Sequence, residues 1–155
     1  MGSMPANILI RRVRPNENGA INALVQTIAD ETFAYLFNGQ VPVPVEESNW
    51  ASAWLAVSAQ EVVGVTMTRE EWVSDLWMRK DARRMGIGTR LLAEAEREIR
   101  SRGHETFRLN VVQTNLRAVH FYESQGWQVH REFLHQKFGH AMFEMTKSDG
   151  AIPRL

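Results

Sequence analysis

The chain contains no cysteine, which excludes disulfides, thiolate metal sites and a cysteine nucleophile. It has no run of about 18 apolar residues, so we expect no membrane-spanning segment, and nothing in it resembles a secretory signal. Its 18 basic and 18 acidic residues cancel, and a neutral chain is a poor candidate for nonspecific binding of nucleic acid. These absences favour a cytoplasmic protein whose partners are neither nucleic acid nor membrane.

The length of 155 residues, with 44% hydrophobic and 23% charged residues, suits one globular domain. We interpret residues 1–3 as a probable cloning remnant, residues 4–150 as a single domain and residues 151–155 as a C-terminal tail. The charge is uneven along the chain. Residues 1–78 hold 4 basic and 9 acidic side chains (4 − 9 = −5), which leaves 14 and 9 for residues 79–155 (+5). This asymmetry favours an anionic ligand on the second half and a cationic one on the first.

A glycine-containing turn joins a predicted strand at residues 72–78 to a predicted helix at residues 89–102. Gly86 and Gly88 leave their backbone amides uncovered where the helix begins, in a segment that also contains four basic residues. Amides at a helix N-terminus bind phosphate-bearing anions; the alternative is that the glycines only permit a tight turn. The spacing matches neither a Walker A loop nor a dinucleotide fingerprint, which would need a glycine at Leu91.

Hydrophobic periodicity predicts an α/β chain with the element order β-α-βββ-α-β-α-ββ, folded as a mixed sheet with helices on both faces. The predicted strands are residues 8–13, 51–57, 62–68, 72–78, 106–112, 127–133 and 141–146. The predicted helices are residues 20–37, 89–102 and 115–125, and turns are expected at residues 16–19 and 69–71. In the strand at 72–78, Val73, Leu76 and Met78 are spaced by three and then two. Either chance or a β-bulge explains this spacing, and a bulge would free backbone groups for a ligand.

Two motifs resemble those of the GCN5-related N-acetyltransferase (GNAT) superfamily. The first is Arg83-x-x-Gly86-x-Gly88, which is similar to the superfamily's acyl-CoA signature. The second is similar to its Asn-x-x-Ala-x-x-Phe-Tyr-x-x-x-Gly-Phe helix. The residues that match the second motif are Asn115, Ala118, Phe121, Tyr122, Gly126 and, in place of the last Phe, Trp127. The resemblance implies a GNAT-like acyl-CoA N-acyltransferase fold whose sheet is splayed between its fourth and fifth strands.

The resemblance also implies acetyl-CoA as cosubstrate, with no metal. The diphosphate would meet the amides of the glycine turn, and the pantetheine arm would pair with the backbone of the fourth strand. Asn115 would hydrogen-bond the arm from the other side; as an alternative, it is a plain helix cap. The implied cofactor-binding residues are Leu76, Trp77, Met78, Arg83, Arg84, Met85, Gly86, Ile87, Gly88, Thr89 and Asn115.

Tyr122 is the predicted catalytic acid, because a tyrosine at this place in the superfamily protonates the departing thiolate. An ordinary tyrosine titrates near pH 10 and so carries its proton at neutral pH; the alternative is an aromatic that only packs. The implied mechanism is direct transfer in a ternary complex, with a strand amide near Leu76 stabilising the oxyanion. Asp75 is the first choice for the general base. The alternatives, acting through water, are Asp30, Glu31, Glu46 and Glu47.

The predicted function is transfer of an acetyl group from acetyl-CoA to a primary amine of a small molecule or peptide. Glu31, Phe33 and Tyr35 would line a site for a cationic amine; the alternative is that some of these aromatics belong to the core. Asn110 stands where relatives that acetylate protein N-termini carry a glutamate, which argues against ribosomal-protein acetylation by the same base. The alternative functions are a non-catalytic acyl-CoA sensor and a partner-binding module, and a homodimer is one expected assembly.

Overall fold

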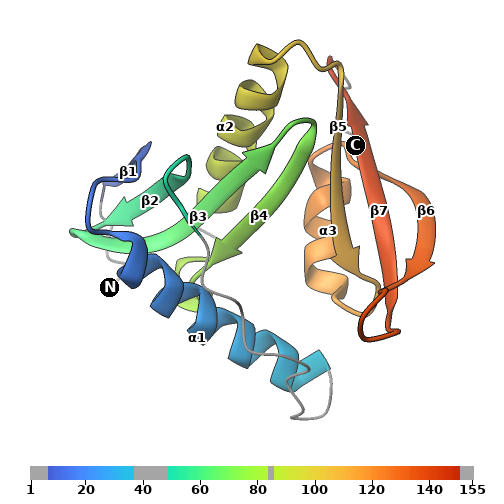
Figure 1. Ribbon diagram of the computed structural model, residues 1–155, viewed down its shortest axis with the longest axis horizontal. Helices are drawn as coiled ribbons and strands as arrows, with labels where there is room; N and C mark the ends of the chain where they lie inside the picture. Colours follow the sequence, from blue (N-terminus) through green and yellow to red (C-terminus); the bar gives the residue numbers. More distant parts are fainter. Residues whose placement is uncertain (1–6, 37–48, 84–85, 151–155) are drawn as a thin grey trace, which may run out of the picture.

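A seven-stranded mixed sheet runs through the molecule in the order β1-β2-β3-β4-β5-β7-β6 (Figure 1). The computed structural model describes residues 7–36, 49–83 and 86–150, without the side chains of 33–36. The strands are β1 (Ile8–Arg12), β2 (Trp54–Ser58), β3 (Glu61–Arg69), β4 (Trp72–Met78), β5 (Thr106–Val112), β6 (Gln128–Leu134) and β7 (Ala141–Ser148). The helices are α1 (Asn18–Leu36), α2 (Ile87–Ser101), α3 (Leu116–Ser124) and the short 3-10 helix η1 (Lys80–Ala82). The order of strands and α-helices confirms the predicted one.

Alternation along the N-terminal strands places the helices on both faces of the sheet, as predicted. Leu55 and Val65 pack with residues of α1 in one cluster. Ala56, the neighbour of Leu55 on β2, points to the opposite face and packs with Leu91 of α2. Successive side chains of a strand face opposite sides, so α1 and α2 cover different faces. None of the helices in the described ranges is long and apolar enough to cross a membrane.

The C-terminal strands share their core with α2 and α3. Phe107 and Leu109 of β5 pack with Ile99 of α2 and Val119 of α3 in a single cluster. Trp127, which precedes β6, is buried in the same cluster with 2% of its surface exposed. The helical stripe predicted for α2 therefore joins the two halves of the sheet on one face.

A β-bulge, one of the two explanations for the spacing in β4, is present at Ser74. The register with β3 passes from Met67 opposite Asp75 to Thr68 opposite Val73, so Ser74 is the extra residue. On its other side β4 runs parallel to β5, and the two strands pair at a single position, Trp72 opposite Arg108. Figure 1 shows them diverging from this point toward their carboxyl ends. The splay expected between these strands is thus part of the fold.

Several element limits differ from the sequence-based expectations by one to three residues, and three local details stand out. α1 begins at Asn18, inside the turn predicted at 16–19, because Ile21 N–H already donates to Glu17 C=O at 3.0 Å. β2 begins at Trp54 rather than at 51, because a bond from Ala53 N–H to Trp50 C=O closes a turn there. The 3-10 helix at Lys80–Ala82 was not predicted.

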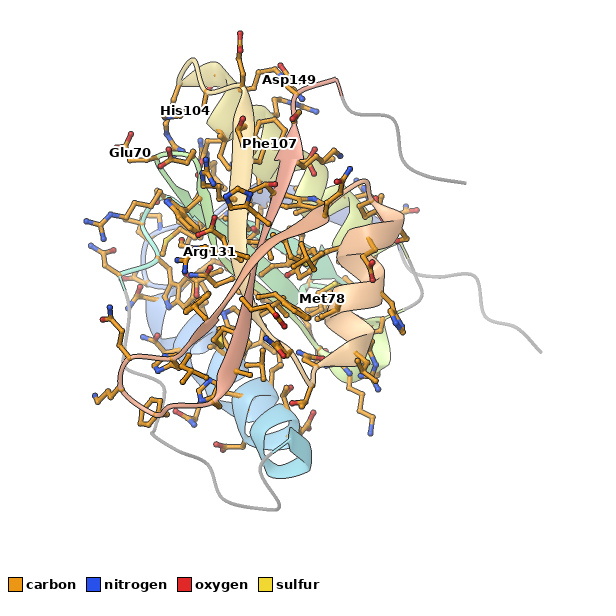
Figure 2. All side chains as sticks on the ribbon, turned by 90° about the vertical axis from the view of Figure 1, so that its right-hand side faces the viewer. Glu70, Met78, His104, Phe107, Arg131 and Asp149 are labelled. Carbon is orange, nitrogen blue, oxygen red and sulfur yellow. The ribbon has the colours of Figure 1, made fainter. Side chains whose placement is uncertain are left out.

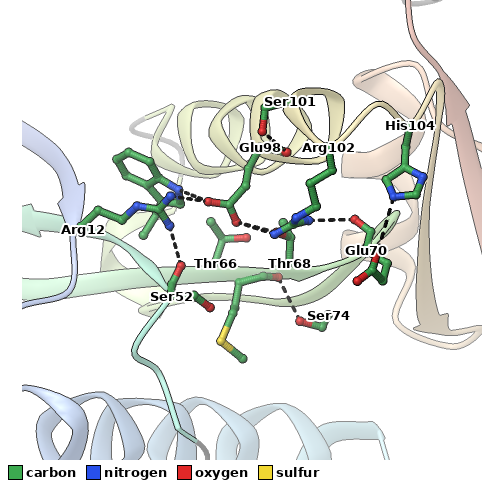
Figure 3. Close-up of polar contacts among 12 residues, drawn as sticks. Arg12, Ser52, Thr66, Thr68, Glu70, Ser74, Glu98, Ser101, Arg102 and His104 are labelled. Carbon is green, nitrogen blue, oxygen red and sulfur yellow. Dashed lines mark hydrogen bonds and ion pairs between the residues drawn. The ribbon is translucent and has the colours of Figure 1, made fainter.

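Glu98 of α2 is the centre of a polar cluster that ties this helix to the N-terminal strands (Figure 3). Its carboxylate accepts hydrogen bonds from Thr68 Oγ1 at 2.6 Å, Trp54 Nε1 at 3.1 Å and Arg102 Nη2 at 3.2 Å. Arg12 adds an ion pair at 2.6 Å. Burial alone would raise the pKa of Glu98, but these donors outweigh it and the pKa is lowered. The folded state therefore favours the charged carboxylate.

We expect Glu98→Ala to lower the free energy of unfolding by about 2 kcal/mol, because it leaves the buried Thr68 hydroxyl and the half-buried Trp54 N–H without this acceptor. Glu61→Ala removes a single, largely exposed pair with Arg79 and should cost less than about 1 kcal/mol. Since the folded pKa of Glu98 is lowered, its contribution is complete above the ordinary carboxyl pKa and is lost as pH falls through the folded pKa. Urea unfolding of both variants against pH measures this. Equal costs for the two variants would contradict the role given to Glu98.

Candidate functional site

Gly86 caps the N-terminus of α2 in a conformation that favours glycine. Its φ is +75°, and a Cβ added there would meet no atom within 4 Å. Ile87, the next residue, is fully buried and anchors the turn against the sheet. The first amides of a helix have no acceptor within the helix, and Thr89 in this turn is exposed. The turn therefore presents bare backbone donors to open space. Arg84 and Met85 lie outside the described residues.

Gly88 has a different task, because it lies where three elements meet. A Cβ added there would be 2.8 Å from Met78 Sδ and 3.2 Å from Phe121 Cζ. Met78 ends β4 and lies beside α3 in Figure 2, and Phe121 belongs to α3. The missing side chain lets the start of α2 approach both. The two glycines of the motif thus serve two purposes, one for backbone conformation and one for close packing.

Positive charge surrounds this turn. The half-buried Arg83 has a lowered pKa, caused first by burial and then by repulsion from Arg117, with attraction to Glu31 of α1 acting in the opposite direction. An anion bound here would compensate the two arginines. Glu31 is exposed on α1 and close enough to act on Arg83 electrostatically.

The ring of Tyr122 packs against other aromatic side chains, while its hydroxyl has no hydrogen-bond partner among the described residues. Its ring lies 5.4 Å from that of Phe121 and 6.1 Å from that of Trp127, centroid to centroid. It packs against the same hydrophobic cluster as Leu76 of β4. Its hydroxyl forms no hydrogen bond with any residue in the described part of the chain, and burial raises its pKa. The phenol therefore keeps its proton at neutral pH and is not committed to another group.

Asp75 follows the bulge and has a perturbed carboxyl group. Burial raises its pKa, opposed by hydrogen bonds from Trp77 and Ser74; Trp77 Nε1 donates to Asp75 Oδ1 at 3.0 Å. A carboxylate with a raised pKa is a stronger base than an ordinary one. Asp30, one of the alternative bases, is exposed and accepts a hydrogen bond from Gln26 of the same helix.

The backbone beside Asp75 is held by two hydroxyl groups that the sequence reading did not single out. Thr66 Oγ1 donates to Asp75 C=O at 2.8 Å, and Ser74 Oγ donates to Met67 C=O at 3.1 Å. In a trans peptide the C=O and the following N–H point in opposite directions. The Leu76 N–H therefore points away from the Thr66 hydroxyl on β3. Both hydroxyls bridge strands, and single-strand periodicity carries no signal for such a contact.

The remaining predicted residues divide into described and undescribed ones. Asn115 is the N-cap of α3, and its side chain accepts from Ala118 N–H at 3.4 Å, so the capping alternative is confirmed. Its second expected role, toward the cofactor, stays a prediction. Phe33 and Tyr35 belong to α1, but their side chains lie outside the described residues, as do Glu46 and Glu47 altogether.

A pocket of about 310 Å³ lies between β4 and β5, beside the bulge. Residues of β3, β4 and β5 line it: Arg69, Trp72, Val73, Ser74 and Asn110. Apart from Asn110, none of these was considered a site residue. The irregular spacing around Ser74 was the only signal in the sequence. Within the described ranges, no group of three His, Asp or Glu side chains could hold a metal ion.

A bare helix N-terminus, a pair of splayed parallel strands and a protonated tyrosine beside them occur together on one side of the sheet. The sequence model of the acetyltransferase (GNAT) family matches residues 22–127 of the chain. The chain belongs to this family. A comparison with curated proteins gives no match.

Several solved structures share the fold of this chain. The solution structure of apo YjaB from Escherichia coli has a TM-score of 0.71 and 21% identity, covering 92% of this chain and 99% of that one. PaiA N-acetyltransferase from Thermoplasma acidophilum, in complex with coenzyme A, has a TM-score of 0.72 and 17% identity (92% and 99% covered). Naa50 from Arabidopsis thaliana, in complex with a CoA-peptide bisubstrate analogue, has a TM-score of 0.67 and 18% identity (91% and 98%). At these identities the likeness shows the GNAT fold alone.

Proposed function

We propose that this GNAT protein is an acetyl-CoA-dependent N-acetyltransferase acting on a primary amine of a small molecule or peptide. The observation that carries the proposal is the course of β4, which leaves its neighbour β5 after one pairing and leads to the bare amides of α2. A strand with free backbone groups on one side can bind an extended chain as an additional strand. The pantetheine arm of CoA is such a chain, with a diphosphate at its end.

Binding would use residues of β4 and α2. The backbone of Leu76, Trp77 and Met78 pairs with the arm, and the turn containing Gly86 and Gly88 receives the diphosphate. The positive charge of Arg83, which burial and Arg117 disfavour more than Glu31 favours it, supports an anion there. Arg84, Met85, Ile87 and Thr89 complete the turn, and Asn115 faces the arm from α3. The complex of PaiA with coenzyme A supports this choice of ligand.

Transfer would proceed in a ternary complex. The amine nitrogen attacks the thioester carbonyl and forms the C–N bond; the carbonyl oxygen becomes an oxyanion that the Leu76 N–H stabilises. The C–S bond then breaks, and Tyr122 gives its proton to the departing thiolate. Asp75 takes the proton that the amine loses. The unengaged hydroxyl of Tyr122 and the raised pKa of Asp75 support these roles.

Two measurements test this function. CoA should raise the melting temperature of the protein, and acetyl-CoA incubated with a panel of amines should release free thiol with at least one of them. Tight binding of acetyl-CoA without thiol release would support a sensor, and no stabilisation by CoA would support a partner-binding module. The amine itself, a homodimer, the domain limits and a cytoplasmic location stay predictions.

A further inference from the structure

The pocket between β4 and β5 lies in line with the proposed position of the cofactor arm, and this inference rests on that proposed function. The arm would follow β4 from Met78 toward Leu76, where the thioester is placed. Beyond Asp75, which does not line the pocket, β4 continues in the same direction with Ser74, Val73 and Trp72, and all three line it. Trp72, the last of these residues, pairs with Arg108 and joins the two strands. A group attached to the cofactor sulfur would therefore enter this pocket.

The lining combines apolar walls with hydrogen-bond donors. Val73 and Trp72 supply the walls, and the Ser74 hydroxyl is already engaged with Met67 C=O. Arg69 and Asn110 have exposed side chains that form no hydrogen bond or ion pair with the residues in the described ranges. No acidic residue lines the pocket. Its one cation is therefore uncompensated.

The other arginine near this end of the cleft is not free. Arg108 of β5 forms an ion pair with the buried Glu144 at 3.1 Å, and Arg131 approaches the same carboxylate at 3.1 Å. Glu144 is 5% exposed, and its carboxylate is paired with these two arginines inside the protein. An anion that enters the pocket would find Arg69 and the Asn110 amide as its available donors.

We infer that the pocket, besides serving acetyl transfer, admits longer acyl groups and among these favours a short chain that ends in a carboxylate, such as succinyl. An acetyl group places a single methyl beyond the thioester carbonyl and would leave most of the 310 Å³ unfilled. Two methylene groups can lie against Val73 and Trp72, and a carboxylate at their end can accept charge-assisted hydrogen bonds from Arg69.

The reaction balances as it does for acetyl transfer. The acceptor nitrogen forms a bond to the acyl carbon, the C–S bond breaks, the amine gives up one proton and the CoA thiolate gains one. The terminal carboxylate takes no part and remains ionised, so the product is an amide that carries a new negative charge.

Butyryl-CoA and succinyl-CoA form a matched pair for the test, because both acyl chains have four carbons and differ in a terminal methyl or carboxylate. Calorimetry without an acceptor should show succinyl-CoA binding about threefold to tenfold more tightly than butyryl-CoA to the wild-type protein. Arg69→Gln should remove this preference and leave acetyl-CoA affinity unchanged. Arg97→Gln, at a 71% exposed position on α2, should leave both unchanged.

A second arm separates the acyl group from the acceptor as the source of the carboxylate. With acetyl-CoA fixed, β-alanine and propylamine are compared as acceptors. If Arg69→Gln alters the ratio of their KM values but not the discrimination between acyl-CoAs, the carboxylate belongs to the acceptor and the acyl assignment is overturned. If the wild type binds CoA but binds succinyl-CoA and butyryl-CoA equally, the inference about the acyl group is overturned and the proposed function is not. Absence of CoA binding overturns the proposed function together with it.

Discussion

Tyr122→Phe should lower kcat about a hundredfold or more, with CoA affinity changed by less than about twofold. The substitution keeps the ring that packs between Phe121 and Trp127 and removes only the hydroxyl. Since that hydroxyl has no hydrogen-bond partner in the described part of the chain, its removal leaves no group unpaired and should hardly affect stability. The substitution therefore slows only the chemical step, in which the CoA thiolate departs without a proton donor.

Single-turnover measurements separate this chemical effect from product release. The rate of thiol appearance in one turnover should fall with kcat, and the melting temperature should stay within about two degrees of wild type. Because burial raises the pKa of Tyr122, ionisation of this residue should not limit the wild-type rate anywhere near neutral pH. An unchanged single-turnover rate in the variant would remove Tyr122 from the role of acid.

Gly86→Ala should weaken CoA binding about tenfold or more. The new methyl group points into space that is empty in this structure, and under the proposed function the diphosphate occupies that space. The positive φ adds about 1 kcal/mol of backbone strain, which lowers stability modestly. Affinity for CoA is measured by calorimetry and stability by urea unfolding.

Gly103→Ala is the matched control, since Gly103 follows the other end of α2. Its φ is +91°, and an added Cβ there also meets no atom within 4 Å. The control should therefore cost the same stability as Gly86→Ala and leave CoA affinity unchanged. If both variants bind CoA like the wild type, the diphosphate does not lie over Gly86.

The sequence predicted the elements well because their signals are local. Periodicity marked α2 and β5, whereas the interrupted spacing from Val73 to Met78 was compatible with chance as well as with the bulge that is present. Sequence did not identify Ser74 as the extra residue, because that depends on which residues of β3 lie opposite. The hydroxyl of Thr66 was missed for the same reason: its bond to Asp75 C=O joins residues on different strands.

The two glycines of the motif look alike in the sequence, and only packing separates them. Only glycine fits at position 88, because a Cβ there would collide with Met78 and Phe121, which belong to elements before and after it in the chain. The acids of the first half that were expected to line the acceptor site stay a prediction. The described pocket at the bulge is a different place, and it contains Arg69 and no acid. Residue type alone could not show which charges meet there.

The single pairing between β4 and β5 divides the sheet into two blocks that are joined mainly through α2. On one block Glu98 bonds to Thr68 of β3, and on the other Glu96 pairs with Lys147 of β7 at 2.9 Å. The helix α2 thus connects the two blocks of the sheet along one face. A ligand that pairs with β4 would add hydrogen bonds to its backbone on the side where β4 leaves β5. We therefore expect amide hydrogen exchange in β4 to slow far more with CoA than with inorganic phosphate.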